Sequence, residues 1–253
     1  MKAFCVQHDI IWEDKPATHA RVRALLDSAE IPPGSLIVLA EMFSTGFSMN
    51  VSGIKEGPDR ETERFLSDLA ERSGSYVIGG IVTADGDKGR NEAVVYNPRG
   101  TEIARYCKMR PFTLGGEADC YQAGDRPALF EWQGIKVAPF ICYDLRFPEL
   151  FRQAVSMGAQ MYAVIASWPS MRAEHWVKLL HARAIENQAY VVGVNRVGTD
   201  PKFTYLGRSM IVNPAGEILA DAGDREAVVG ADIDLDFLLR YRKELPFLVD
   251  MRD

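Results

Sequence analysis

Three ionisable residues follow apolar, strand-like segments of this sequence. Glu41 follows LIVLA, Lys108 ends the segment EIARYCK, and Cys142 follows IKVAPFI. Catalytic groups of open α/β sheets gather where strands run into loops, so we expect these side chains to converge on one crevice. Each also has an ordinary interpretation: a glutamate or lysine that reaches solvent, or a cysteine that packs as a small apolar residue. What indicates a catalytic role is that all three residues lie at the end of a strand-like segment.

The segment YDLRFPELFRQAVSMGA after Cys142 predicts a tight turn followed by an amphipathic helix. A thiol on such a turn is exposed to substrate, and the next backbone N–H, that of Tyr143, can point at an oxyanion. A free thiol has a pKa of about 8.5, so Cys142 needs a base or a cation near neutral pH. Glu41 is the candidate general base and Lys108 the candidate oxyanion partner. The predicted chemistry is nucleophilic attack by the thiol on an amide.

The longest irregular stretch, Met109–Arg126, is long enough to indicate a functional loop. It carries a second acid, Glu117, which could position the substrate or balance the charge of Lys108. An ordinary surface acid is the alternative for Glu117. The loop is therefore expected to border the site.

Further candidates would form the substrate pocket. Phe112, Tyr143 and Trp168 lie within or just after the strand-end motifs, so their rings could exclude water, although ordinary core packing is the alternative. Arg146 could bind the far carboxylate of an acidic substrate, because a guanidinium pairs with a carboxylate bidentately. An ion pair with Glu149 or a subunit contact is the alternative for Arg146.

The elements that must position these residues alternate along the chain in an α/β pattern. The segments YNPRGTEIA and VNPAGEILA match each other and predict two hairpins of one design, around Asn97–Gly100 and Asn213–Gly216. A duplicated hairpin, placed each time after strand and helix units, indicates two similar halves whose sheets pack face to face. We therefore expect a four-layer αββα sandwich formed by a single domain over residues 1–253.

Further expected strands cover residues 3–7, 36–40, 76–82, 92–96, 102–108, 210–212 and 217–219, and the expected helices cover residues 16–29, 59–72 and 173–187.

Composition narrows the classes of partner. The net charge of −6 argues against a nucleic-acid or anionic-membrane surface, which needs concentrated positive charge. The start MKAFCVQHDI lacks the pattern of a secretory signal, and no apolar run reaches the roughly 18 residues that span a bilayer. The cysteines and histidines show no zinc-binding spacing. We expect a cytoplasmic protein that acts on a small molecule without a metal.

These residues and motifs resemble the nitrilase superfamily of carbon–nitrogen hydrolases. Its Glu–Lys–Cys triad matches Glu41, Lys108 and Cys142 in order and setting, within LAEMFSTGF, YCKMRPFTLGGE and ICYDLRFPEL. Glu117 falls where many members carry a second active-site glutamate, and Ala40 departs from the proline that often precedes the base. The resemblance implies the αββα fold, no metal or organic cofactor, and at least a homodimer.

Within the superfamily, EMFSTGF, CYDLRFPEL and ASWP are most similar to omega-amidases, which release ammonia from 2-oxo acid amides such as 2-oxoglutaramate. A carbamoylase, a nitrilase or a general aliphatic amidase of the same superfamily is the first alternative. The second alternative is of another class, a thiol-binding or redox-sensing module without turnover.

Overall fold

The computed structural model describes residues 1–252, and within them the strands form two six-stranded sheets and a two-stranded ribbon. The first sheet contains β1 (Lys2–Gln7), β2 (Leu36–Val38), β3 (Tyr76–Asp85), β4 (Lys88–Tyr96), β5 (Glu102–Cys107) and β14 (Ala227–Asp232). The second contains β6 (Phe130–Trp132), β7 (Ile135–Ile141), β8 (Met161–Ala166), β9 (Tyr190–Asn195), β12 (Met210–Val212) and β13 (Ile218–Asp221). The ribbon is formed by β10 (Val197–Thr199) and β11 (Thr204–Leu206).

The helices are α1 (Lys15–Asp27), α2 (Val51–Ile54), α3 (Glu61–Ser73), α4 (Glu117–Cys120), α5 (Pro148–Ser156), α6 (Ala173–Asn187) and α7 (Leu235–Glu244). Short 3₁₀ turns are η1 (Thr113–Gly115), η2 (Cys142–Arg146), η3 (Ser170–Arg172) and η4 (Phe247–Asp250). Among the helices of residues 1–252, none has the length and apolar character needed to cross a membrane.

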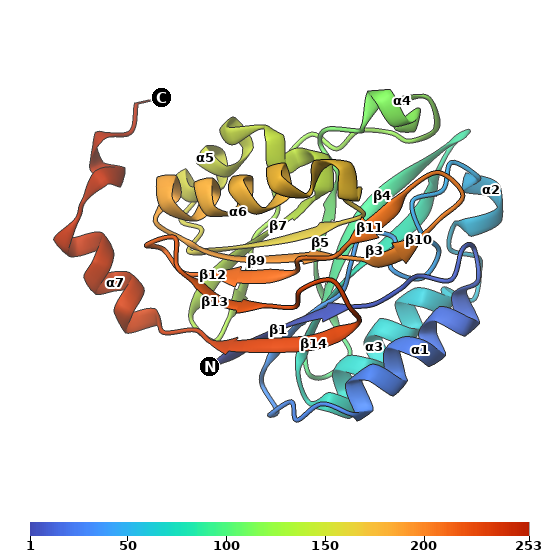
Figure 1. The fold of residues 1–253 in the computed structure, drawn as a ribbon, viewed down its shortest axis with the longest axis horizontal. Coiled ribbons are helices and arrows are strands. Elements are labelled where there is room, and N and C mark those ends of the chain that lie inside the picture. Colours follow the sequence, from blue (N-terminus) through green and yellow to red (C-terminus); the bar gives the residue numbers. More distant parts are fainter. Residues whose placement is uncertain (253) are drawn as a thin grey trace.

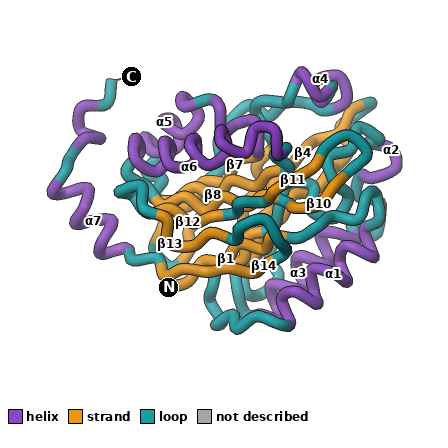
Figure 2. The backbone as a smooth tube through the Cα atoms, viewed as in Figure 1, coloured by secondary structure: helices purple, strands orange, loops and turns teal. Residues whose placement is uncertain are grey.

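The two sheets face each other, since β1 contacts β9 and β4 contacts β7. Helices α1 and α3 cover the outer face of one sheet, and α5 and α6 cover the outer face of the other (Figure 1). Figure 2 shows the strands enclosed between these helices, while α7 and the chain's C-terminal end extend away from the body. The predicted four-layer αββα sandwich is therefore confirmed.

The two halves repeat one topology. Strands β1, β2 and β3 are parallel neighbours, as are β7, β8 and β9, and each set continues into an antiparallel hairpin. In both hairpins an asparagine side chain accepts two backbone N–H bonds across the turn, from Arg99 and Thr101 to Asn97, and from Ala215 and Glu217 to Asn213. Both ladders also shift register one residue before that asparagine. The prediction of two similar halves is thus confirmed in detail.

Most predicted elements agree with the structure within a few residues, and the helix over residues 173–187 agrees at both ends. The strand expected over residues 36–40 is shorter, because β2 ends at Val38 and the chain then bends toward Glu41. The amide of Leu39 still donates to the carbonyl of Ile78, and that of Gly80 donates to Ala40. This bend carries Glu41 off the sheet edge and into the interior.

Candidate active site

The acidic and basic residues predicted from the sequence meet in the interior of the molecule. Glu41 lies beyond β2, Lys108 follows β5, and Glu117 begins α4. Their exposed fractions are 0%, 1% and 0%. The Nζ of Lys108 lies 2.8 Å from Oε1 of Glu41 and 2.8 Å from Oε2 of Glu117. The solvated side chains considered as alternatives for these three residues are therefore excluded.

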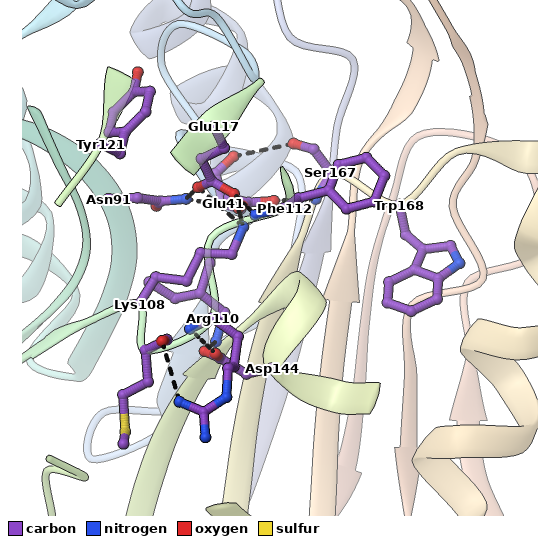
Figure 3. Close-up of polar contacts among 12 residues, drawn as sticks. Glu41, Asn91, Lys108, Arg110, Phe112, Glu117, Tyr121, Asp144, Ser167 and Trp168 are labelled. Carbon is purple, nitrogen blue, oxygen red and sulfur yellow. Dashed lines mark hydrogen bonds and ion pairs between the residues drawn. The ribbon is translucent and has the colours of Figure 1, made fainter. Parts of the chain in front are cut away.

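Two further residues, which the sequence analysis missed, hold the carboxylates in place. The Nδ2 of Asn91, on β4, donates to Oε1 of Glu41 at 2.7 Å and to Oε1 of Glu117 at 2.8 Å. The backbone N–H of Ser167, just after β8, donates to Oε2 of Glu41 at 2.8 Å. Figure 3 shows Asn91 and Lys108 approaching the two carboxylates. Each oxygen of Glu41 thus has a donor, which fixes the direction of the carboxylate.

A glycine allows the Glu41 segment to lie against β3. A Cβ atom at Gly80 would lie 2.7 Å from Cα of Glu41 and 2.8 Å from the carbonyl oxygen of Ala40, far inside normal contact distance. These are backbone atoms, which cannot move aside as the end of a side chain can. The position of Glu41 therefore depends on the absence of a side chain at Gly80.

The thiol lies on the turn that the sequence predicted, at the start of η2 after β7. Cys142 is half-buried and has a φ of 46°, in the left-handed region that non-glycine residues rarely adopt. Burial and the neighbouring Glu41 carboxylate raise the pKa of the Cys142 thiol well above its usual value, and Lys108 only partly opposes this. The thiol is therefore neutral at physiological pH, and its activation requires a base in contact with it.

Lys108 stays charged in this site. Burial disfavours its ammonium, but Glu117 and Glu41 outweigh burial and raise the pKa of Lys108 well above its usual value. Two carboxylates against one ammonium leave the cluster net negative, which also disfavours a resting thiolate. The arrangement suits proton transfer from thiol to carboxylate in the course of reaction, with a fixed cation beside it.

Cys142 opens onto a surface pocket. Phe112, Tyr143, Arg146 and Trp168, the predicted pocket residues, all line it. The lining residues that the sequence analysis did not single out are Phe47, Ser167, Pro169, Arg172, Phe203 and Tyr205. The pocket is thus largely aromatic, with two guanidinium groups at its wall.

The two arginines of the pocket lie against aromatic rings. The Cζ of Arg146 is 4.7 Å from the ring centre of Trp168, and the Cζ of Arg172 is 5.5 Å from that of Phe112. Within residues 1–252 neither arginine forms an ion pair, and Glu149 instead lies near Arg110. Burial, together with the nearby Arg172, lowers the pKa of Arg146. The pocket wall therefore presents positive charge with no acidic partner, and the Arg146–Glu149 pair considered from the sequence is absent from the described residues.

Within residues 1–252, no group of three or more His, Cys, Asp and Glu side chains is arranged to hold a metal ion.

An αββα sandwich with Cys142, Glu41 and Lys108 gathered beneath one pocket is the architecture of a nitrilase-type hydrolase. The family model for carbon–nitrogen hydrolases matches residues 2–243. The chain is 38% identical to omega-amidase YafV of Yersinia enterocolitica over 99% of this chain and 96% of the relative. It is 33% identical to 2-oxoglutaramate amidase of Bacillus subtilis strain 168, over 98% of this chain and 96% of the relative.

A crystal structure of XC1258 from Xanthomonas campestris, a CN-hydrolase superfamily protein with an arsenic adduct in its active site, matches with a TM-score of 0.92. That match has 30% identity and covers 100% of this chain and 97% of the other. The chain belongs to the carbon–nitrogen hydrolase family, and it is a hydrolase of non-peptide amides.

Proposed function

We propose that this protein hydrolyses the omega-amide of a 2-oxo dicarboxylic acid, such as 2-oxoglutaramate, to the free acid and ammonia. The observation that carries this substrate class is the pair Arg146 and Arg172, which face the pocket without an acidic partner among the described residues. A guanidinium pairs well with a carboxylate, and such a substrate carries one at the end opposite its amide. Relatives called omega-amidase and 2-oxoglutaramate amidase support the same class.

In the mechanism we propose, Glu41 takes the proton of Cys142 while the sulfur attacks the amide carbon. The oxyanion that forms is stabilised by Lys108 and by the backbone N–H of Tyr143. Glu41 then gives its proton to the departing ammonia, and a thioester remains on Cys142. Next, Glu41 takes a proton from water, the hydroxide adds to the thioester, and the proton returns to the leaving sulfur. Glu117 holds the Lys108 ammonium in place throughout.

Replacing Arg172 with glutamine is expected to lower kcat/KM for 2-oxoglutaramate about 10- to 100-fold, mainly through KM, since one charge-assisted hydrogen bond to the carboxylate is lost. Activity on a neutral amide such as propionamide should change less than about twofold, because that amide has no carboxylate to pair. Arg90→Gln is the matched control, as Arg90 is exposed and paired with Asp85. Equal losses on both substrates would contradict the assigned role.

The alternatives within the superfamily are separated by a substrate panel. Ammonia release is measured with 2-oxoglutaramate, glutamine, asparagine, aliphatic amides, ureido compounds and nitriles. Fast ammonia release from the 2-oxo acid amide alone supports the proposal. Fast release from another compound alone would show that the protein is a hydrolase with a different substrate. A thiol-binding or redox-sensing module would show a reactive Cys142 without turnover of any compound.

We also propose a homodimer in the cytoplasm. The C-terminal segment exposes Leu239, Phe247 and Val249, with 50%, 58% and 82% of their surface accessible, and an exposed apolar segment favours a subunit contact. All four cysteines are free, as in a reducing compartment. Light scattering should give about twice the chain mass of 28.2 kDa. A monomer at micromolar concentration would contradict the dimer.

A further inference from the structure

Asp144 is a buried carboxylate next to the nucleophile that the mechanism above does not use. It is 0% exposed and lies within η2, two residues after Cys142. Its Oδ2 accepts the hydroxyl of Tyr106 at 2.8 Å and the N–H of Ile141 at 3.0 Å, and its Oδ1 accepts the N–H of Arg110 at 2.9 Å. Figure 3 shows Asp144 beside Arg110, below Lys108. One carboxylate therefore joins the nucleophile's turn to the chain on both sides of Lys108.

Tyr106 provides the connection to the lysine. It lies on β5, two residues before Lys108, which directly follows the strand. Its hydroxyl also accepts the N–H of Met109 at 3.3 Å. Burial and the neighbouring Asp144 raise the pKa of the Tyr106 phenol well above its usual value, so the hydroxyl stays a donor. Tyr106 thus links the strand that presents Lys108 to the turn that presents Cys142.

We propose that Tyr106 and Asp144 are a positioning pair that holds the Cys142 turn in register with Lys108, and that full activity requires Asp144 to be ionised. Neither residue touches the pocket or the reacting atoms. On the far side of the turn, the guanidinium of Arg183 on α6 donates twice to the carbonyl of Leu145, at 3.1 and 2.7 Å. The turn is therefore held both by Asp144 and by α6, and His175 of α6 also contacts it, with its Nδ1 3.3 Å from Nη2 of Arg146 at the end of η2.

The charged state of Asp144 sets the pH dependence. Burial raises the pKa of Asp144 to about 7. The hydrogen bonds from the Ile141 and Arg110 N–H groups and from the Tyr106 hydroxyl lower this pKa, as does the charge of Lys108, but burial outweighs them. The ionisable groups near Asp144 are Lys108, which stays protonated, and the Tyr106 phenol and Cys107 thiol, whose pKa values are raised chiefly by burial. As the pH falls through about 7, protonation removes the negative charge of Asp144, so the three hydrogen bonds that it accepts become weaker and hold the Cys142 turn less firmly. Activity should then fall on the acid side.

The test uses Tyr106→Phe, with Tyr162→Phe as the matched control. Tyr162 is a buried tyrosine whose hydroxyl donates to the carbonyl of Phe151 at 2.9 Å. The Tyr162→Phe variant therefore loses a similar hydrogen bond, but one that does not involve the Cys142 turn. Two quantities are measured from about pH 5.5 to 9: kcat and KM on an amide that the wild type hydrolyses, and the rate of Cys142 alkylation by iodoacetamide.

Tyr106→Phe should lose about 10- to 100-fold in kcat, with KM within about twofold, because a small displacement of the nucleophile slows the chemical step. The acid limb of both profiles should also move to higher pH, because a hydrogen bond that favours ionised Asp144 is gone. A folded Asp144→Asn variant should have a lower kcat than wild type, and its pH profile should lack the fall in activity that protonation of Asp144 causes. An unmoved limb in Tyr106→Phe, or an equal loss of kcat in Tyr162→Phe, would overturn the proposal. The alkylation profile needs no substrate, so it decides this inference even if the 2-oxo acid assignment fails.

Discussion

Cys142→Ala is expected to lower turnover by about 10,000- to 1,000,000-fold while the protein remains folded. The variant removes the only sulfur that opens onto the pocket among the described residues, and the nearby hydroxyl of Ser167 donates to the backbone carbonyl of Glu41 at 3.3 Å rather than to its carboxylate. Alanine at this left-handed position meets much the same backbone strain as cysteine, so stability should change little. Ammonia release and thermal unfolding of the purified variant measure the two effects.

Cys107→Ala is the matched control for this substitution. Cys107 is also a half-buried cysteine beside the site in sequence, but it lies outside the pocket, and burial together with Glu92 raises the pKa of its thiol to about 12. Its replacement should leave turnover within about twofold of wild type. Full activity in Cys142→Ala would refute the covalent mechanism, and equal inactivation of both variants would show that the loss is not specific to Cys142.

The second large effect is expected for Lys108→Met, which should abolish turnover and destabilise the fold by about 3–5 kcal/mol. Methionine fills a similar volume but leaves the buried carboxylates of Glu41 and Glu117 without their cation. Denaturant unfolding at neutral pH measures the loss of stability, and ammonia release measures the loss of turnover.

A double variant separates the two roles of Lys108. Adding Glu117→Gln to Lys108→Met removes one of the uncompensated charges, so the double variant should be more stable than Lys108→Met alone. Activity should not return, because the oxyanion still lacks its ammonium. Wild-type stability in Lys108→Met would contradict the buried ion cluster, and recovery of turnover in the double variant would contradict the proposed role of Lys108.

Much of this fold was predictable because its signals are local. Each hairpin is defined by an Asn-Pro-x-Gly turn, and α6 by a continuous helical pattern, so their positions can be read from short segments. The three ionisable residues were found because each ends an apolar strand segment. These signals require no knowledge of which strands become neighbours.

The supporting residues were not predictable, because their contacts depend on that pairing. Asn91 reaches both glutamates only once β4 lies between β3 and β5. Ser167 contributes a backbone N–H, which almost any residue type could supply, so the sequence does not indicate it. Arg172 lies four residues beyond Trp168 and looks like an ordinary arginine before a helix. Asp144, beside the nucleophile, looks like an acid at a helix start until its three donors are known.

The left-handed conformation of Cys142 sets the demands of chemistry against those of stability at one position. Glycine would adopt a φ of 46° without the roughly 1–2 kcal/mol that an L-residue loses there. Selection for stability alone would thus favour glycine, and only the need for a thiol keeps cysteine in place. A search for stabilising substitutions guided by backbone geometry would select Cys142→Gly early. The resulting protein would be more stable and inactive.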